Sequence, residues 1–177
     1  MNARRAVLLA TFLLVAALAR AEDAPDPIAT AKEGEWVYQK IDSNYGGLKL
    51  TQFLYMWVSK VEGRKLTLGL QIMKDEKRGM MPPFFSPIDL DHREKPAPAK
   101  VSQEDVERDG KKLKCSKREE ASVDSAAGKV TTTSWICPEV PVDGVLRIVS
   151  VDKDGKETSR TETIAWGREG GAEKPVE

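Results

Sequence analysis

Two cysteines placed symmetrically about a short turn constrain this chain more than any other feature. Cys115 lies in a lysine-rich segment, Cys137 follows a threonine-rich segment, and small residues fill positions 124–128 between them. If the two segments fold back about Ala126, each cysteine is 11 residues from the turn and the two lie opposite each other. Directly opposed residues on antiparallel strands bring their Cβ atoms within reach of a disulfide. The sequence therefore predicts a hairpin bridged by Cys115 and Cys137.

The spacing of the cysteines also bears on their chemistry. They are separated by 21 residues, and the chain contains no Cys-x-x-Cys motif of the kind used in redox catalysis. A structural bridge is therefore favoured over a catalytic pair, with two free thiols as the alternative.

The first 21 residues have the organisation of a signal peptide. Arg4 and Arg5 precede an apolar run over residues 6–18, and Ala19-Arg20-Ala21 matches an A-x-A cleavage site. Thirteen apolar residues are too few to span a bilayer comfortably, so a retained membrane anchor is the weaker alternative. We therefore expect export to the periplasm or the extracellular space, with no stable membrane anchor after cleavage.

The remaining 156 residues fit one domain. Removing the three arginines of residues 1–21 leaves 25 basic against 28 acidic residues, a net charge of −3. This mildly acidic, interspersed charge argues against a general nucleic-acid binder. We expect a flexible lead-in with one helical turn over residues 22–34, a folded domain over 35–167 and a disordered tail over 168–177.

Short strands with turn signals every 8–12 residues run through the domain. The clearest is residues 65–73, where leucine and isoleucine alternate with polar residues. The pattern predicts an all-β antiparallel meander of about 8–10 strands, forming a strongly curved sheet or half-barrel. The other expected strands cover residues 35–42, 48–61, 88–92, 104–108, 111–119, 129–137, 145–151 and 156–166.

One strand and one loop carry more apolar surface than this pattern needs. In residues 48–61, Leu54, Met56 and Val58 occupy one face and three aromatic residues the other, so both faces must be covered. Residues 80–85 combine methionine, proline and phenylalanine, a composition that excludes a helix or a central strand. This loop either packs over the aromatic face and closes the core, or stands off as a lid and leaves an apolar groove beneath it. The candidate ligand-binding residues are Phe53, Tyr55, Trp57, Met80, Met81, Phe84 and Phe85.

The remaining polar motifs do not indicate a catalytic, metal or nucleic-acid site. His92 is the only histidine, and no Gly-x-Ser-x-Gly motif accompanies it, so we expect an exposed or strand-end histidine and no catalytic residue. His92 with Asp89 and Asp91 is too small a set for a metal site, and no cofactor is expected. Basic runs such as Lys117-Arg118 have no interleaved aromatic residues, so we expect them to be solvated.

The segment from Lys111 to Gly167 resembles uncharacterised exported bacterial β-sheet proteins. The resemblance is carried by Gly-Lys-Lys-Leu-Lys-Cys and by a tryptophan-led strand that enters the turn Val-Pro-Val-Asp-Gly, here Trp135 to Gly144. Their architecture is similar to that of the half-barrel periplasmic lipoprotein carriers. The present chain departs from such carriers in lacking amphipathic helices that plug the concave face. The resemblance implies an exported β-sheet protein.

The sequence supports three hypotheses. The first is a non-enzymatic exported protein that binds an apolar or lipid-like ligand between a concave sheet face and residues 80–85. The second is a structural or protein-interaction module of the cell envelope, with an envelope protein as partner and no small-molecule site. The third, an enzyme, is the weakest, because it would have to depend on His92.

Overall fold

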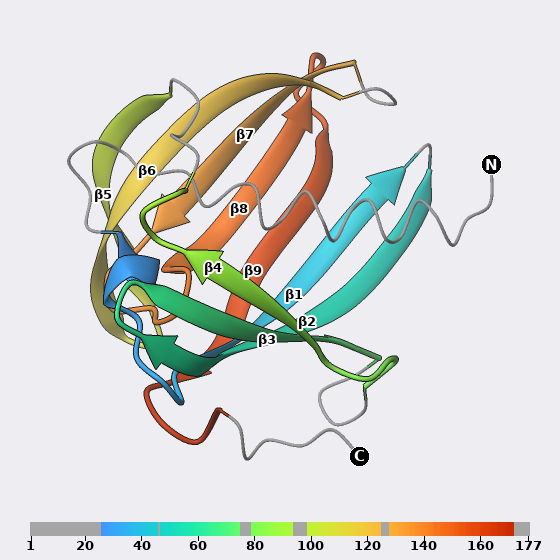
Figure 1. Cartoon of the computed structure of the whole chain (residues 1–177). Coiled ribbons are helices and arrows are strands. Elements are labelled where there is room, and N and C mark those ends of the chain that lie inside the picture. The colour runs from blue at the N-terminus through green and yellow to red at the C-terminus, as the bar shows by residue number, and fades with distance from the viewer. Residues whose placement is uncertain (1–25, 46, 75–78, 94–98, 125–127, 172–177) are drawn as a thin grey trace.

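The computed structural model describes residues 26–45, 47–74, 79–93, 99–124 and 128–171. One antiparallel sheet forms this part of the chain, in the strand order β4-β3-β2-β1-β9-β8-β7-β6-β5 (Figure 1). The elements are η1 (Pro27–Thr30), β1 (Trp36–Tyr45), β2 (Leu48–Glu62), β3 (Lys65–Met73), β4 (Phe84–Asp89), β5 (Lys100–Arg108), β6 (Lys111–Asp124), β7 (Gly128–Ile136), β8 (Val145–Asp152) and β9 (Glu157–Gly167). The predicted all-β meander is confirmed, and the sheet curves without closing into a barrel.

The disulfide and its register are confirmed. Cys115 and Cys137 are bonded, with their Cα atoms 4.2 Å apart. In the β6–β7 hairpin Ser116 pairs with Ile136 and Asp124 with Gly128, so one continuous register places the two cysteines opposite each other. The described residues contain no free cysteine.

The edge strand β4 differs from its predicted position. We expected a strand over residues 88–92, whereas the strand covers Phe84–Asp89 and includes part of the apolar segment. Pro87 lies within it, opposite Thr67 of β3. An edge strand tolerates proline because one side of its backbone has no partner strand.

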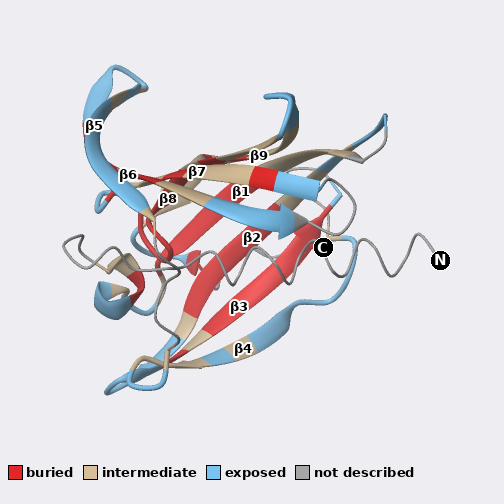
Figure 2. Ribbon diagram, turned by 90° about the horizontal axis from the view of Figure 1, so that it is seen from above, coloured by how far each residue is buried: buried red, intermediate tan, exposed pale blue. Residues whose placement is uncertain are grey.

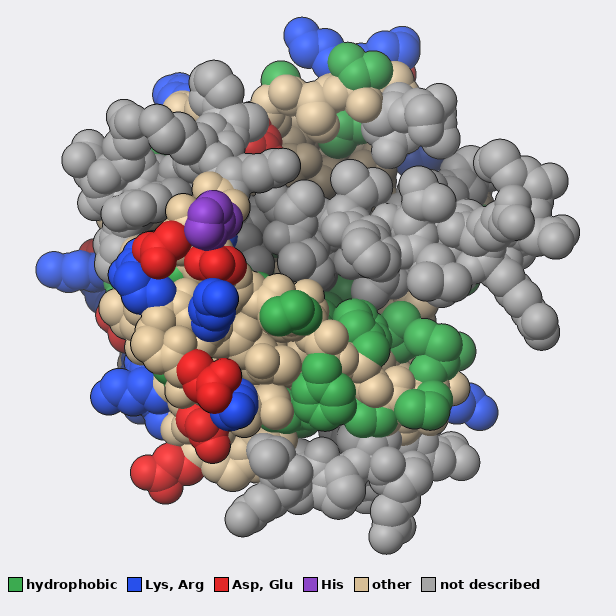
Figure 3. All heavy atoms as spheres, viewed as in Figure 1, with side chains coloured by type: hydrophobic (Ala, Val, Ile, Leu, Met, Phe, Trp, Pro, Cys, Tyr) green, Lys and Arg blue, Asp and Glu red, His purple; other side chains and the backbone are tan. Residues whose placement is uncertain are grey.

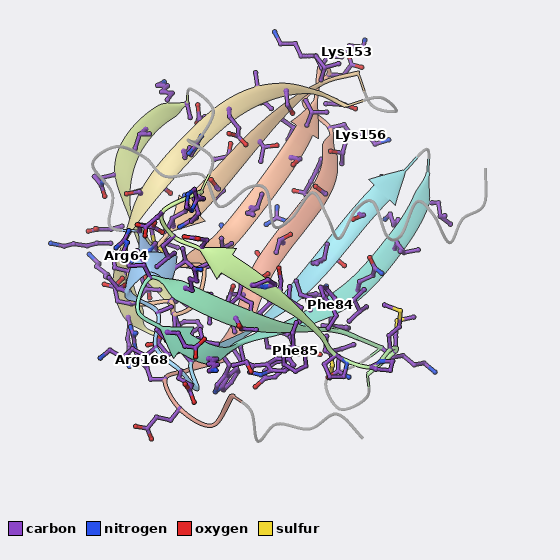
Figure 4. The ribbon with its side chains drawn as sticks, in the orientation of Figure 1. Arg64, Phe84, Phe85, Lys153, Lys156 and Arg168 are labelled. Atoms are coloured by element: carbon purple, nitrogen blue, oxygen red, sulfur yellow. A yellow bond between two sulfur atoms is a disulfide. The ribbon has the colours of Figure 1, made fainter. Side chains whose placement is uncertain are left out.

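The sheet has two ends that differ in how they are covered. Strand direction alternates, so the β1–β2, β3–β4, β6–β7 and β8–β9 connections share one end, the open end. The other, closed end is covered by η1 and by residues 137–144, which bury Ile28, Val140 and Val142 completely or nearly so. Figure 4 shows Lys153 and Lys156 at the open end and Arg64 and Arg168 at the closed end.

The curved sheet has an inner and an outer face. Inner side chains of β1, β2 and β3 form one core with Ile28, Val140 and Val142: Val37, Leu54, Met56, Val58, Leu66, Leu68 and Leu70. The outer face carries ion pairs over β8, β9 and β1, such as Arg147–Glu162 and Lys40–Asp42. Burial is concentrated in β2 and β3, while the edge strands β4 and β5 are largely exposed (Figure 2).

No helix among the described residues has both the length and the apolar character needed to cross a membrane.

Candidate functional site

The predicted ligand-binding residues separate onto two faces. Tyr55 and Trp57 are buried, and Phe53 packs beside them on the outer face, away from Leu54, Met56 and Val58. We predicted that these three aromatic residues line the concave face, and that assignment is wrong. The reason is that the strand is apolar on both sides, so its alternation alone does not show which side faces the interior of the curve.

The three aromatic residues belong to a larger cluster, the outer aromatic patch. It consists of Trp36, Tyr38, Phe53, Tyr55, Trp57 and Phe85, with neighbouring ring centroids 5.4–6.3 Å apart. Aromatic pairs at this spacing are favourable beyond their buried area. Trp36 and Tyr38 were not predicted as members, although the alternation of the first strand placed them on one face together.

Residues 168–171 cover part of the patch. The Trp36 indole Nε1 donates to the Glu169 carbonyl at 3.0 Å, and the Tyr55 hydroxyl donates to the Gly171 carbonyl at 2.8 Å. Arg168 pairs with the buried Glu35 carboxylate at 2.6 Å, and burial raises the pKa of Tyr55. We predicted a disordered tail from residue 168. That prediction is wrong for residues 168–171, while residues 172–177 lie outside the described ranges.

Gly69 makes the patch possible. A Cβ atom at position 69 would lie 2.1 Å from Cε2 of Trp57, because the indole ring lies directly over the glycine. Gly69→Ala is therefore expected to lower the free energy of unfolding by about 1–3 kcal/mol, the usual cost of overfilling a packed site. Urea denaturation measures it.

The control for this prediction removes the ring. In a Trp57→Leu background, Gly69→Ala should cost nearly nothing, and the double-mutant cycle should assign the difference to the contact between the two residues. An equal cost in both backgrounds would show that Trp57 is not the reason for the glycine.

The segment 80–85 neither folds over the aromatic face as a whole nor stands apart from the sheet. Met80 donates its backbone N–H to the Ile72 carbonyl at 2.8 Å, and the Gln71 side chain donates to the Met81 carbonyl at 2.9 Å. Phe84 pairs with Leu70 on the inner side, whereas Phe85 contacts Trp57 on the outer side (Figure 4). Met80, Met81, Phe84 and Phe85 nevertheless remain 42–58% exposed.

These four side chains form an apolar surface that runs from the β3–β4 connection at the open end, which holds Met80 and Met81, to Phe84 and Phe85 opposite the middle of β3. Figure 3 shows hydrophobic side chains exposed together along β4, away from the charged groups around His92. Eight large hydrophobic residues are exposed in the described part of the chain. Val61 lies toward the closed end, and Phe84 and Phe85 lie opposite the middle of β3. The five toward the open end are Leu48, Met80, Met81, Val101 and Val123.

Near the open end, the inner face is apolar over one half of the sheet and mainly polar over the other half. Over β1 and β2 it presents Ile41, Leu48 and Leu50, which are half-buried or exposed. Over β6 to β8 it is mainly polar, with Arg118 opposite Ser134 and a Thr132–Ser150 hydroxyl contact of 3.0 Å. Arg118 was predicted to be solvated, and that prediction is wrong: Arg118 is on the inner face and 3% exposed, whereas the adjacent Lys117 lies over Trp135 on the outer face.

A buried polar cluster lies near the closed end. Asp143 accepts hydrogen bonds from the Val145 backbone N–H at 3.0 Å and from Gln39 Nε2 at 2.9 Å. Thr163 lies on the other side of the same Gln39 amide. Burial raises the pKa of Asp143 to about 7, against the opposing effect of these hydrogen bonds. Sequence reasoning treated Asp143 only as part of a turn.

His92 lies just beyond β4 with its side chain 83% exposed, and its Nδ1 is 3.0 Å from Asp89 Oδ2. The Asp91 backbone N–H and this imidazole lower the pKa of the Asp89 carboxyl. Among the residues described, no three His, Cys, Asp or Glu side chains gather as metal ligands would.

No protein-family model, no curated protein and no solved structure matches this chain.

Proposed function

We propose that this is an exported, non-enzymatic protein that binds an apolar, lipid-like ligand on the inner face at the open end of the curved sheet. The observation that carries the proposal is the exposed apolar surface that runs from Phe84 on β4 through Met80 and Met81 to that end. Exposed apolar surface of this kind is costly in water and marks interaction sites in soluble proteins. Methionine and phenylalanine can adapt to ligands of variable shape.

The inner face supplies the rest of the proposed site. Phe84 follows the inner row formed by Val37, Met56 and Leu70, and it ends that row at the exposed edge strand. An acyl chain entering beside Phe84 would therefore continue onto apolar side chains. Burial of apolar ligand surface against them would provide the affinity.

Export is supported by the Cys115–Cys137 bridge, because stable disulfides belong to oxidising compartments. The predicted signal peptide lies outside the described residues. Residues 22 onward would then form the mature protein, free to collect a ligand in the periplasm or outside the cell.

Two neighbouring phenylalanines allow a matched test. Phe84→Ser is expected to weaken binding of the neutral fluorescent probe N-phenyl-1-naphthylamine about tenfold, since the loss of roughly 1.4 kcal/mol of apolar contact corresponds to that factor. Phe85→Ser, which changes the same residue type on the outer side, should leave the dissociation constant within about twofold of wild type. Fluorescence titration of both variants measures these values.

The proposal fails if wild type binds no probe, or if both substitutions have the same effect. Thermal unfolding of each variant shows whether the fold is retained, so that a lost signal is not confused with unfolding.

A second candidate function has its own observation. Phe85 and Met81 are exposed on or near the outer side, where a ligand on the inner face would not cover them. An envelope protein could cover both residues. Stronger loss of probe binding in Phe85→Ser than in Phe84→Ser would favour this protein-interaction surface over an inner ligand site.

A further inference from the structure

The methionines of the described chain fall into an exposed pair and a buried pair. Met80 and Met81 are 58% and 43% exposed, whereas Met56 on β2 and Met73 on β3 are 5% and 4% exposed. Met1 belongs to the predicted signal peptide and lies outside the described residues. An oxidant in solution therefore reaches two neighbouring methionines of the folded domain and is kept from the other two.

No thiol competes with this exposed pair for an oxidant. The two cysteines of the chain, both in its described part, are bonded to each other and fully buried. A free thiolate is usually the sulfur that an oxidant attacks first, and a disulfide does not offer one. The thioethers of Met80 and Met81 are therefore the reduced sulfur atoms that a solution oxidant meets first.

The backbone around the exposed pair is fixed to β3. The Met80 N–H donates to the Ile72 carbonyl at 2.8 Å, and the Gln71 side chain donates to the Met81 carbonyl at 2.9 Å. Both hydrogen bonds use backbone atoms of the segment and neither uses a thioether. A chemical change at the sulfur atoms would therefore alter the exposed surface and leave these hydrogen bonds in place.

We propose that Met80 and Met81 form an oxidation site through which a peroxide lowers the affinity for the apolar ligand. This inference rests on the proposed function, because it concerns regulation of the same apolar surface. In each reaction hydrogen peroxide transfers an oxygen atom to the thioether sulfur, its O–O bond breaks, and water leaves. The sulfur loses two electrons and becomes a sulfoxide, while the peroxide is reduced.

Oxidation changes what the surface can bind. A thioether is apolar, whereas a sulfoxide oxygen is polar and costs free energy when an apolar ligand covers it. Met80 and Met81 lie between Phe84 and the open end, so the oxidised side chains would interrupt the apolar surface there. Methionine sulfoxide reductases convert the sulfoxide back to the thioether, which makes the change reversible.

The test treats the wild-type protein with hydrogen peroxide. Peptide mass spectrometry is expected to show oxygen addition at Met80 and Met81 about tenfold faster than at Met56 and Met73. Titration with N-phenyl-1-naphthylamine should then give a dissociation constant about tenfold weaker than before oxidation. Methionine sulfoxide reductases should restore the original value, and an unchanged thermal midpoint shows that the oxidised protein is folded.

Two double variants serve as matched controls. Met80→Leu/Met81→Leu keeps apolar side chains at the exposed positions and should bind the probe equally well before and after peroxide treatment, because leucine has no sulfur. Met56→Leu/Met73→Leu removes the buried thioethers instead and should lose affinity as the wild type does. Exchange of methionine for leucine is among the best tolerated changes in a packed core.

Similar oxidation rates at all four methionines would overturn the inference and leave the proposed apolar site standing. Unchanged probe affinity after oxidation of Met80 and Met81, or an equal loss of affinity in Met80→Leu/Met81→Leu, would do the same. Absence of probe binding before oxidation would instead remove the proposed function itself. The wild type and Met80→Leu/Met81→Leu decide the question even if Met56→Leu/Met73→Leu does not fold.

Discussion

The free energy of unfolding of the wild-type protein is expected to fall by roughly 4 kcal/mol as the pH rises from about 4 to about 7, and Asp143→Asn is expected to abolish that fall. Burial of Asp143 beside Gln39 raises the pKa of its carboxyl from 3.8 to about 7. Each pKa unit corresponds to about 1.4 kcal/mol. Urea denaturation at pH steps between 4 and 8 measures the effect.

The direction follows from proton binding. The unfolded chain releases the Asp143 proton near pH 4, whereas the folded protein retains it to about pH 7. Between these values the folded state binds more protons, so its stability decreases as the pH rises. The contribution is complete below pH 4 and lost above pH 7. Asparagine has nearly the shape of the protonated acid and does not titrate.

The partners of Asp143 make asparagine a suitable replacement. Its side-chain oxygen can accept the Val145 N–H. Its amide replaces the oxygen that accepts from Gln39 Nε2, so the Gln39 amide must turn over to present Oε1, a buried acceptor that has no hydrogen-bond partner in the described part of the protein, to the new N–H. Glu107→Gln, a change at an exposed carboxylate on β5, should keep the wild-type pH dependence. A wild-type stability that rises between pH 5 and 7 would contradict the burial of a protonated Asp143.

Replacing both cysteines with alanine is expected to lower the free energy of unfolding by about 3 kcal/mol, because the bridge restricts the unfolded chain over a separation of 22 residues. The loss should be large relative to the 5–15 kcal/mol of a typical domain. Cys137 also begins the segment that returns to Gly144, through a hydrogen bond of 2.8 Å from its N–H to the Gly144 carbonyl. That segment carries Val140, Val142 and Asp143 into the core.

The redox control uses the same two proteins. A reductant should destabilise wild type by a similar amount and leave the Cys115→Ala/Cys137→Ala variant unchanged. Intact mass after alkylation, with and without prior reduction, reports the thiols directly. Two alkylated cysteines in the unreduced wild type would contradict the bridge.

Features that depend on neighbouring stretches of chain were predictable. The register of the β6–β7 hairpin follows from a turn and from strand pairing on either side of it, so counting residues from Ala126 placed the cysteines correctly. The alternation in β3 likewise predicted its limits and the set of side chains on its apolar face. Both limits of β4 were predicted inaccurately, because whether a proline can lie in a strand depends on the strand being at an edge.

The candidate site was predictable only in part. Composition singled out residues 80–85 as surplus apolar side chains and left open whether they close the core; Met80, Met81, Phe84 and Phe85 are exposed. It did not show that Phe84 and Phe85 face opposite sides of the sheet, since that requires the pairing partners Leu70 and Gly69. Arg118 and Lys117 look alike in the sequence, yet one is buried on the inner face and the other lies beside Trp135 on the outer face.

The sequence by itself determined the strand rhythm, the bridged hairpin and the presence of surplus apolar side chains, because each of these depends on residues close together in the chain. Only the tertiary structure decided which face of β2 is the interior and what covers the other one. The buried Tyr55 hydroxyl donates to the carbonyl of Gly171, 116 residues away in the chain. The buried Asp143 carboxylate accepts from the side chain of Gln39, 104 residues away. Whether a residue is buried depends on which distant segments pack against it, and the local sequence pattern does not contain that information.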